Sequence, residues 1–249
     1  GNPMSTAIAI TSGKGGTGKT SLTGGVASCL AALGHRVLCI DMDIGLRNLD
    51  LSLGMSDRAL MDFTDVVSGR TTLEKAAVAH PVIQGLYLLT APLTQPRDVI
   101  TEEKLRAFLA QAKASYDYVL MDAPAGLGGG FRMSVCGADR ALVVSTTDAS
   151  ALRDAQRTVG ELGRSIRSLH LVVNRVQPKL LRQLHTTIDD AMDAAGLPLL
   201  GVVPEDPQVM LAANRGQPLI LMARYGAARA YLNIARRLTG ERVPLMRIR

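Results

Sequence analysis

The chain has 249 residues, 47% of them hydrophobic, which suits one α/β domain with a well-buried core. No apolar run is long enough to span a bilayer, and the three cysteines form no Cys-x-x-Cys pair, which favours a reducing cytosol over a disulfide framework or an iron–sulfur site. The net charge of +6 lies in residues 224–249, which hold seven arginines and one acid, so a diffuse face for nucleic acid is not expected.

The first three residues precede Met4 and look like an expression scar, so we take a single domain to run over residues 4–249. Residues 7–10 are all apolar and predict a strand. A helix rich in alanine and leucine is predicted over residues 20–33. The segment between them carries the most specific pattern in the chain.

Residues 13–20 read Gly-Lys-Gly-Gly-Thr-Gly-Lys-Thr, a phosphate-binding loop with an additional lysine directly after its first glycine. The glycines allow backbone amides to converge on phosphate oxygens, Lys19 supplies a point charge, and Thr20 offers a hydroxyl to Mg²⁺. The helix that follows would present its N-terminus to the phosphates. We therefore expect ATP to bind through Gly13, Lys14, Gly15, Gly16, Thr17, Gly18, Lys19 and Thr20. The alternative is a glycine-rich turn without a nucleotide.

The additional lysine, Lys14, has a side chain that points away from the phosphates of its own loop. It can instead reach across a dimer. The alternative is an ordinary solvated lysine.

Six further apolar runs alternate with segments of helical periodicity such as residues 105–112 and 152–162. Continuous apolar strands indicate a parallel sheet that is buried on both faces, and the segments between them read as crossover helices. The predicted fold is a single α/β domain of the P-loop NTPase class, with a mostly parallel central sheet flanked by helices on both faces. The predicted strands are 36–40, 86–90, 118–121, 141–145, 169–173 and 199–203.

Three carboxylates follow strands, and ligands of such sheets bind beyond the carboxyl ends of the strands. Asp122 fits the position of an aspartate that orients Mg²⁺, usually through water, and Asp41 is expected to support the same metal shell. Asp43 is placed to position or polarise the attacking water. The alternative is a set of turn and cap aspartates. The next segment, 44–51, is read as a loop too polar for the core that senses the γ-phosphate.

The loop with two lysines resembles that of the MinD/ParA family of ATPases. Residues 41–50, Asp-x-Asp-Ile-Gly-Leu-Arg-Asn-Leu-Asp, are similar to the MinD branch rather than to plasmid-partition ParA. The similarity covers nearly the whole chain, because further segments match in the same order: 122–126, 150–154, 172–175, 201–206 and 233–237.

The resemblance implies a cytoplasmic, Mg-dependent ATPase that dimerises around two ATP molecules and is slow without a stimulating partner. Lys14 would contact the nucleotide of the partner subunit, and Lys14, Lys19 and Asp43 would be the catalytic residues. The ATP dimer would attach peripherally to the inner face of the cell membrane, recruit a MinC-like division inhibitor and respond to a MinE-like regulator. The alternatives are a ParA-like DNA-partition ATPase and a flagellar-number regulator of related fold.

The resemblance also implies how the base is held, since Asn174 and the loop Pro204, Glu205 and Asp206 would flank adenine. The amide of Asn174 can both donate and accept hydrogen bonds, although a turn residue is the alternative. Two departures stand out. Gly128 occupies a position where relatives carry an acid. The basic helix and tail at about 224–249 end without the amphipathic membrane helix of most relatives, so we expect that the chain has been cut there.

Overall fold

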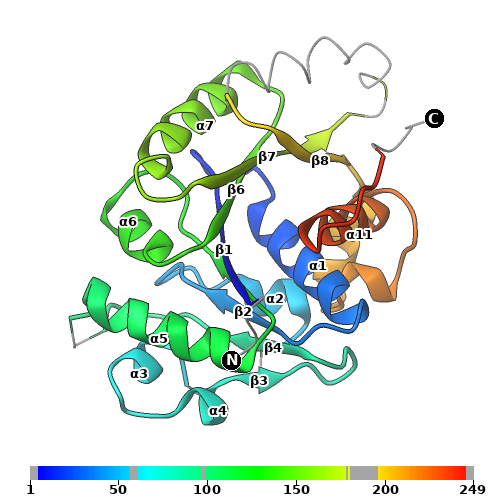
Figure 1. Cartoon of the computed structure of the whole chain (residues 1–249). Coiled ribbons are helices and arrows are strands. Elements are labelled where there is room, and N and C mark those ends of the chain that lie inside the picture. The colour runs from blue at the N-terminus through cyan, green and yellow to red at the C-terminus, as the bar shows by residue number, and fades with distance from the viewer. Residues whose placement is uncertain (1–4, 57–60, 97–98, 178, 180–195, 245–249) are drawn as a thin grey trace.

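The computed structural model describes residues 5–56, 61–96, 99–177, 179 and 196–244. Within these ranges one eight-stranded sheet has the order β3-β4-β2-β5-β1-β6-β7-β8 (Figure 1). Neighbouring strands are parallel except β3 and β4. The strands are β1 (Thr6–Thr11), β2 (Val37–Asp41), β3 (Val78–Ala79), β4 (Leu86–Leu89), β5 (Tyr118–Asp122), β6 (Arg140–Ser145), β7 (Ser168–Val176) and β8 (Leu199–Pro204).

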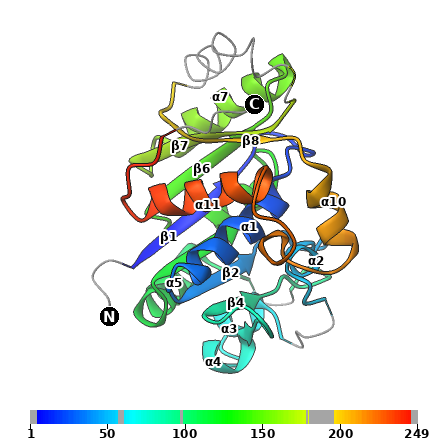
Figure 2. The ribbon, with the colours of Figure 1, turned by 90° about the vertical axis from the view of Figure 1, so that its right-hand side faces the viewer.

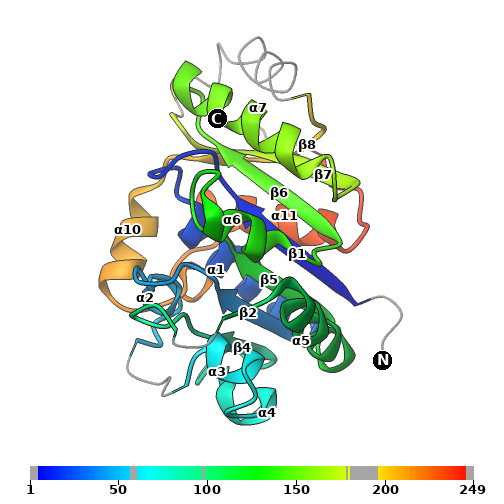
Figure 3. The same cartoon turned by 90° about the vertical axis from the view of Figure 1, so that its left-hand side faces the viewer.

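Helices cover both faces of the sheet. Figure 2 shows α1 and α11 on one face, and Figure 3 shows α5, α6 and α7 on the other. No helix in the described ranges is both long and apolar enough to cross a membrane. The helices are α1 (Lys19–Ala32), α2 (Leu49–Leu53), α3 (Phe63–Val67), α4 (Leu73–Ala76), α5 (Glu102–Ser115), α6 (Gly129–Val135), α7 (Ala149–Leu162), α10 (Pro207–Asn214) and α11 (Ala227–Leu238), with a 3-10 turn, η1 (Leu219–Leu221).

Strand β1 lies between β5 and β6 inside the sheet, which explains why its residues are apolar at successive positions. Its side chains alternate between the two faces, so Ile8 and Ile10 pack in the layer of α1 and α11, whereas Ala7 and Ala9 pack in the layer of α5 and α7. All four residues are fully buried. The predicted α/β fold with a mostly parallel sheet is therefore confirmed. Among the strands in the described ranges, the short antiparallel edge strand β3 is the one that was not predicted.

The prediction that residues 44–51 form a loop too polar for the core is wrong for its last part. Leu49 begins α2, and both Leu49 and Leu53 are fully buried. One helical turn separates these two leucines, so they lie on the same side of α2, which packs against α1. The helix ends at Gly54, whose φ of 68° is the left-handed conformation typical of a helix C-terminus.

The basic C-terminal segment is more structural than its charge suggests. The guanidinium of Arg237 donates hydrogen bonds to the carbonyls of Leu200 (2.9 Å) and Val243 (3.0 Å). Arg236 lies 3.8 Å from Glu241. Arg237 therefore connects α11 to β8, and both arginines contact the segment that follows α11. The last two arginines of the sequence lie outside the described residues.

The contact between α1 and α11 depends on a glycine. A Cβ atom added to Gly25 in α1 would lie 2.3 Å from the Cδ2 atom of Tyr231, whose side chain is buried in α11. Because Tyr231 is enclosed by the layer that covers the sheet, it has little room to move. The close packing of these helices therefore requires a residue without a side chain at position 25.

We predict that Gly25→Ala lowers the free energy of unfolding by about 1–3 kcal/mol, because the overpacking outweighs the higher helix propensity of alanine. Gly160→Ala in α7 is the matched control, since a Cβ atom there meets nothing within 4 Å. The control should be neutral or stabilising by up to about 1 kcal/mol. Urea unfolding of both variants measures the difference, and equal effects would contradict the packing argument.

Candidate nucleotide-binding site

The loop between β1 and α1 has the open backbone that a phosphate requires. Gly16 and Gly18 have φ of 80° and 79°, and a Cβ atom at Gly15 or Gly16 would meet no other atom within 4 Å. The buried hydroxyl of Thr17 has no hydrogen-bond partner among the described residues. A buried polar group without a partner is uncommon in a folded protein. These features fit a loop that binds a phosphate group.

Lys19, the first residue of α1, is nearly buried, and its ammonium contacts the carboxylate of Asp122 at the end of β5. The hydroxyl of Thr20 donates to the other oxygen of Asp122 at 2.9 Å. Thr23, one turn further along α1, donates to the carbonyl of Lys19 at 2.8 Å. Sequence reasoning placed Lys19, Thr20 and Asp122 at one site, and the structure brings these three residues together.

Asp41 is the register partner of Asp122 on the neighbouring strand and is almost fully buried. Its two carboxylate oxygens accept hydrogen bonds from the backbone N–H groups of Asp43 (2.9 Å) and Leu49 (3.2 Å). Burial raises the pKa of Asp41 to about 6, an effect that these N–H donors oppose and the charge of Asp122 reinforces. In this structure Asp41 therefore organises the chain from β2 to α2.

Asp43 lies just outside this buried pair and is half-buried. Burial raises the pKa of Asp43, the charge of Lys19 lowers it, and the charge of Asp122 raises it again. The three predicted carboxylates thus share one edge of the sheet in different environments. Only Asp43 has a carboxylate that no described hydrogen bond or ion pair engages.

Lys14 extends to the start of α7, where its ammonium lies 3.5 Å from Asp148. Both side chains are substantially exposed, 41% and 53%, so the pair contributes little stability and can exchange. Asp148 also caps α7 by accepting from the backbone N–H of Ala151 at 2.9 Å. Sequence reasoning did not single out Asp148, and no local signal pairs two residues so far apart in the chain.

On the other side of the loop lies a cavity of about 560 Å³ between α1, β7, β8 and α10. It brings together all four residues that were predicted to flank the base. A pocket of this size accommodates a small organic ligand. Its lining includes Gly18, Ser21, Asn174, Arg175, Pro204, Glu205, Asp206, Pro207, Met210 and Tyr231.

Within this cavity Asn174 contacts the phosphate loop directly. It lies inside β7 rather than after it, and its amide donates to the carbonyl of Thr17 at 2.7 Å. A Cβ atom on Gly18 would lie 2.5 Å from that amide nitrogen. Asn174, which was expected at the edge of the base, therefore also holds the phosphate loop against β7.

Arg175 is a site residue that sequence reasoning missed. Its guanidinium donates to the carbonyl of Gly16 (2.8 Å) and to the carboxylate of Glu205 (3.0 Å). Its φ of 55° is unusual for a residue with a side chain and carries a strain cost. A left-handed backbone at an arginine has no sequence signature, so this role could only be found in the structure.

The structure gives Asp206 a clear local role. One carboxylate oxygen accepts from the N–H of Gln208 (2.9 Å) and caps α10, and the other accepts from the N–H of Ala227 (3.0 Å) at the start of α11. Asp206 thus joins the two helices at the rim of the base cavity. Its contact with a base remains a prediction.

Metal binding was expected at Thr20, Asp41 and Asp122. Mg²⁺ prefers oxygen ligands and usually keeps several waters, and the hydroxyl of Thr20 beside the carboxylate of Asp122 supplies two suitable groups. No cluster of three or more His, Cys, Asp or Glu side chains arranged for a metal ion occurs in the part of the chain that the structure describes. These residues therefore fit a metal held partly by water and phosphate, and the assignment stays a prediction.

Comparisons with known proteins agree with this geometry. The profile of the CobQ/CobB/MinD/ParA nucleotide binding domain matches residues 8–219. The septum site-determining protein MinD of Bacillus subtilis is 42% identical over 246 residues, which cover 97% of this chain and 92% of the relative. The chain belongs to the MinD family.

Solved structures of this family share the fold described above. A MinC:MinD cell division protein complex from Aquifex aeolicus contains a chain with a TM-score of 0.90 and 40% identity, covering 98% of this chain and all of that one. The MinD of Pyrococcus horikoshii, solved with Mg-ADP, has a TM-score of 0.81 and 27% identity, covering 94% and 96% of the two chains. As a member of the MinD family, the chain is an ATPase, and its residues 8–219 match a nucleotide-binding domain.

The raised pKa of Asp41 predicts a pH dependence of stability. A pKa that is higher in the folded state than the usual value of 3.8 stabilises the fold below about pH 4, and this contribution is lost as the pH rises through about 6. The free energy of unfolding of the wild type relative to Asp41→Asn should therefore fall across this range, by on the order of 2–3 kcal/mol. Urea unfolding in EDTA at several pH values measures it.

Asp148→Asn is the control with the opposite sign. The hydroxyl of Thr146 and the N–H of Ala151 lower the pKa of Asp148, so its charged form favours the folded state. Relative to this variant, the wild type should gain stability as the pH rises through the acidic range. A difference between wild type and Asp41→Asn that stays constant with pH would show that burial does not disfavour the charge on Asp41.

Proposed function

We propose that this ATPase is Mg-dependent, dimerises around two ATP molecules and acts in the placement of the division septum. The observation that carries this proposal is the complete phosphate loop, whose additional lysine, Lys14, extends out of the loop and forms a weak, exposed ion pair with Asp148. The similarity to MinD proteins over nearly the full chain supports the positional role.

In this proposal the phosphates of ATP bind the amides of residues 13–20 and the ammonium of Lys19. Mg²⁺ neutralises phosphate charge when bound, with Thr20 and Asp122 to hold it and Asp41 to support them. The base enters the cavity beside Asn174 and the segment 204–206. Phosphoryl transfer depends mainly on positioning and charge stabilisation, and this arrangement supplies both.

Lys14 is proposed to complete the site of a second subunit. Its pair with Asp148 is exposed, so transfer of the ammonium to a phosphate of the partner would replace a weak interaction with a stronger charge-assisted one. A site that is completed only in the dimer explains why turnover by single chains should be slow.

The proposed partners follow from the family. The Aquifex relative was solved as a MinC:MinD complex, which supports a MinC-like division inhibitor as a partner of this chain. A MinE-like regulator would stimulate hydrolysis. The ATP dimer would sit peripherally at the inner face of the cell membrane and leave it when hydrolysis separates the subunits.

Two lysine variants separate binding from dimerisation. Lys19→Ala should abolish ATP binding, because the loss of a charge-assisted contact of about 1.5–3 kcal/mol leaves phosphate charge uncompensated. Lys14→Ala should keep ATP affinity within about threefold of wild type but prevent ATP-dependent dimers and hydrolysis. Calorimetry measures the affinity and light scattering the mass. Equal loss of affinity in both variants would reject the role of Lys14 across the dimer.

Asp43→Ala should give the opposite phenotype to Lys14→Ala. ATP should still bind and dimers should persist, since only the positioning of the attacking water is lost, and we expect turnover to fall by at least a hundredfold, in line with the loss of an acid–base group. Size measurement with ATP, together with a phosphate-release assay, checks both parts. Turnover at the wild-type rate would move the catalytic assignment from Asp43 to Asp41.

A further inference from the structure

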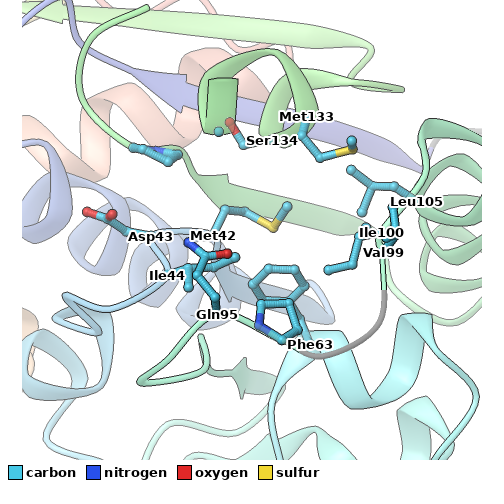
Figure 4. Close-up of a pocket in the computed structure, with 13 residues that line it drawn as sticks. Met42, Asp43, Ile44, Phe63, Gln95, Val99, Ile100, Leu105, Met133 and Ser134 are labelled. Atoms are coloured by element: carbon cyan, nitrogen blue, oxygen red, sulfur yellow. The ribbon is translucent and has the colours of Figure 1, made fainter. Parts of the chain in front are cut away.

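A second cavity, of about 530 Å³, lies on the opposite side of the phosphate loop from the base cavity. Figure 4 shows it between the end of β2, the chain that follows β4, and helices α5 and α6. None of the residues predicted to bind ATP lines it, and Asp43 is the one proposed catalytic residue in its lining. Its lining is Met42, Asp43, Ile44, Phe63, Gln95, Pro96, Val99, Ile100, Leu105, Pro124, Gly130, Met133 and Ser134.

The lining is strongly asymmetric. Asp43 is its only ionisable residue, and it lies at one end of the cavity in Figure 4, whereas Leu105, Ile100 and Val99 lie at the other end. The neutral polar side chains of Gln95 and Ser134 lie between these ends. The cavity therefore offers one negative end and one apolar end.

The carboxylate at the negative end forms no direct ion pair with a described residue. Among the residues that the structure describes, no basic side chain forms an ion pair with Asp43 within 4 Å, and the nearby ammonium of Lys19 is engaged by Asp122. Partial burial of a carboxylate is unfavourable for its charged form unless a cation accompanies it. A cation that enters the cavity would remove this penalty.

We propose that this cavity binds a small amphiphilic amine, with its ammonium on the carboxylate of Asp43 and its apolar body against Ile100 and Leu105. The volume lies within the range of roughly 300–1,000 Å³ that is typical of small-molecule sites. A neutral apolar molecule would leave Asp43 without a partner. A carboxylate would place like charges together, which is unfavourable in a partly buried site.

Occupancy of the cavity has a consequence that rests on the proposed function. The lining includes both Asp43, after β2, and Pro124, after β5, so one ligand contacts the two segments that follow the phosphate-facing strands. An ammonium on Asp43 would occupy the carboxylate that is proposed to position water. Bound amine should therefore slow hydrolysis without displacing the nucleotide.

The test compares three probes of equal length on the full chain without nucleotide: 4-phenylbutylamine, 4-phenylbutanol and 4-phenylbutyrate. Binding is followed by nitrogen-15 NMR titration. We expect the amine to bind at least tenfold more tightly than the alcohol, and the carboxylate to bind more weakly than either. In Asp43→Asn the amine and the alcohol should differ by less than threefold.

A matched pair of valine variants tests the apolar end. Val99 lines the cavity and is 78% exposed, so Val99→Trp can cover that end without disturbing the core. Val82 is 66% exposed and lies outside the lining, so Val82→Trp adds the same side chain elsewhere. Val99→Trp should weaken binding of both the amine and the alcohol at least fivefold, and Val82→Trp should leave both unchanged.

Equal affinity of amine and alcohol for the wild type would overturn the proposal, as would a preference for the amine that persists in Asp43→Asn or binding that Val99→Trp does not alter. Because these titrations need no ATP, they do not depend on the proposed function. ATP turnover with saturating amine is a separate measurement. Tight binding with unchanged turnover would support the amine site and reject the role of Asp43 in hydrolysis.

Discussion

The nucleotide site is built around the buried pair of Lys19 and Asp122. A buried charge that loses its partner costs several kcal/mol, so each of these groups holds the other in place at the junction of β5 and α1. A phosphate that enters the loop is an alternative anion for Lys19. The Lys19 ammonium can move from one anion to the other without being left unpaired. This explains how a charged group can be tolerated in a nearly buried position.

The register of the sheet places a second carboxylate beside this pair, and the chain handles its charge differently. Asp41 forms no ion pair with a described residue and accepts hydrogen bonds from two backbone N–H donors, which fix the start of the segment after β2 and the start of α2. The cost of this arrangement appears in its raised pKa. Both buried carboxylates are engaged by protein groups, so Asp43 is the one of the three whose oxygens form no described hydrogen bond or ion pair.

Sequence reasoning found what depends on local pattern and missed what depends on folding. The phosphate loop and the apolar strands could be predicted because glycine, lysine and uninterrupted apolar runs each indicate a specific local structure. The short helix α2 was missed, since its two buried leucines stand among polar residues in a segment of only five positions.

The remaining misses join residues that are remote in the chain. The contacts of Lys14 with Asp148 and of Arg175 with Gly16 connect separate βα units. Local sequence periodicity cannot predict such contacts. Asp206 was predicted beside the base from the family resemblance, and that contact stays a prediction. Its cap on α11, a helix that begins some twenty residues later, was not predicted. Such roles follow from how the strands are ordered in the sheet.

That strand order also explains why the two cavities differ. The phosphate loop follows β1, near the middle of the sheet, with β6, β7 and β8 on one side and β5, β2 and β4 on the other. The cavity beyond β7 and β8 contacts the loop through Asn174 and Arg175, so its occupant acts on the loop backbone. The cavity beyond β2 contains Asp43, so its occupant acts on a carboxylate. In our proposals, one sheet edge thus separates recognition of the nucleotide from control of its hydrolysis, so a ligand in the cavity with Asp43 would alter hydrolysis without preventing nucleotide binding.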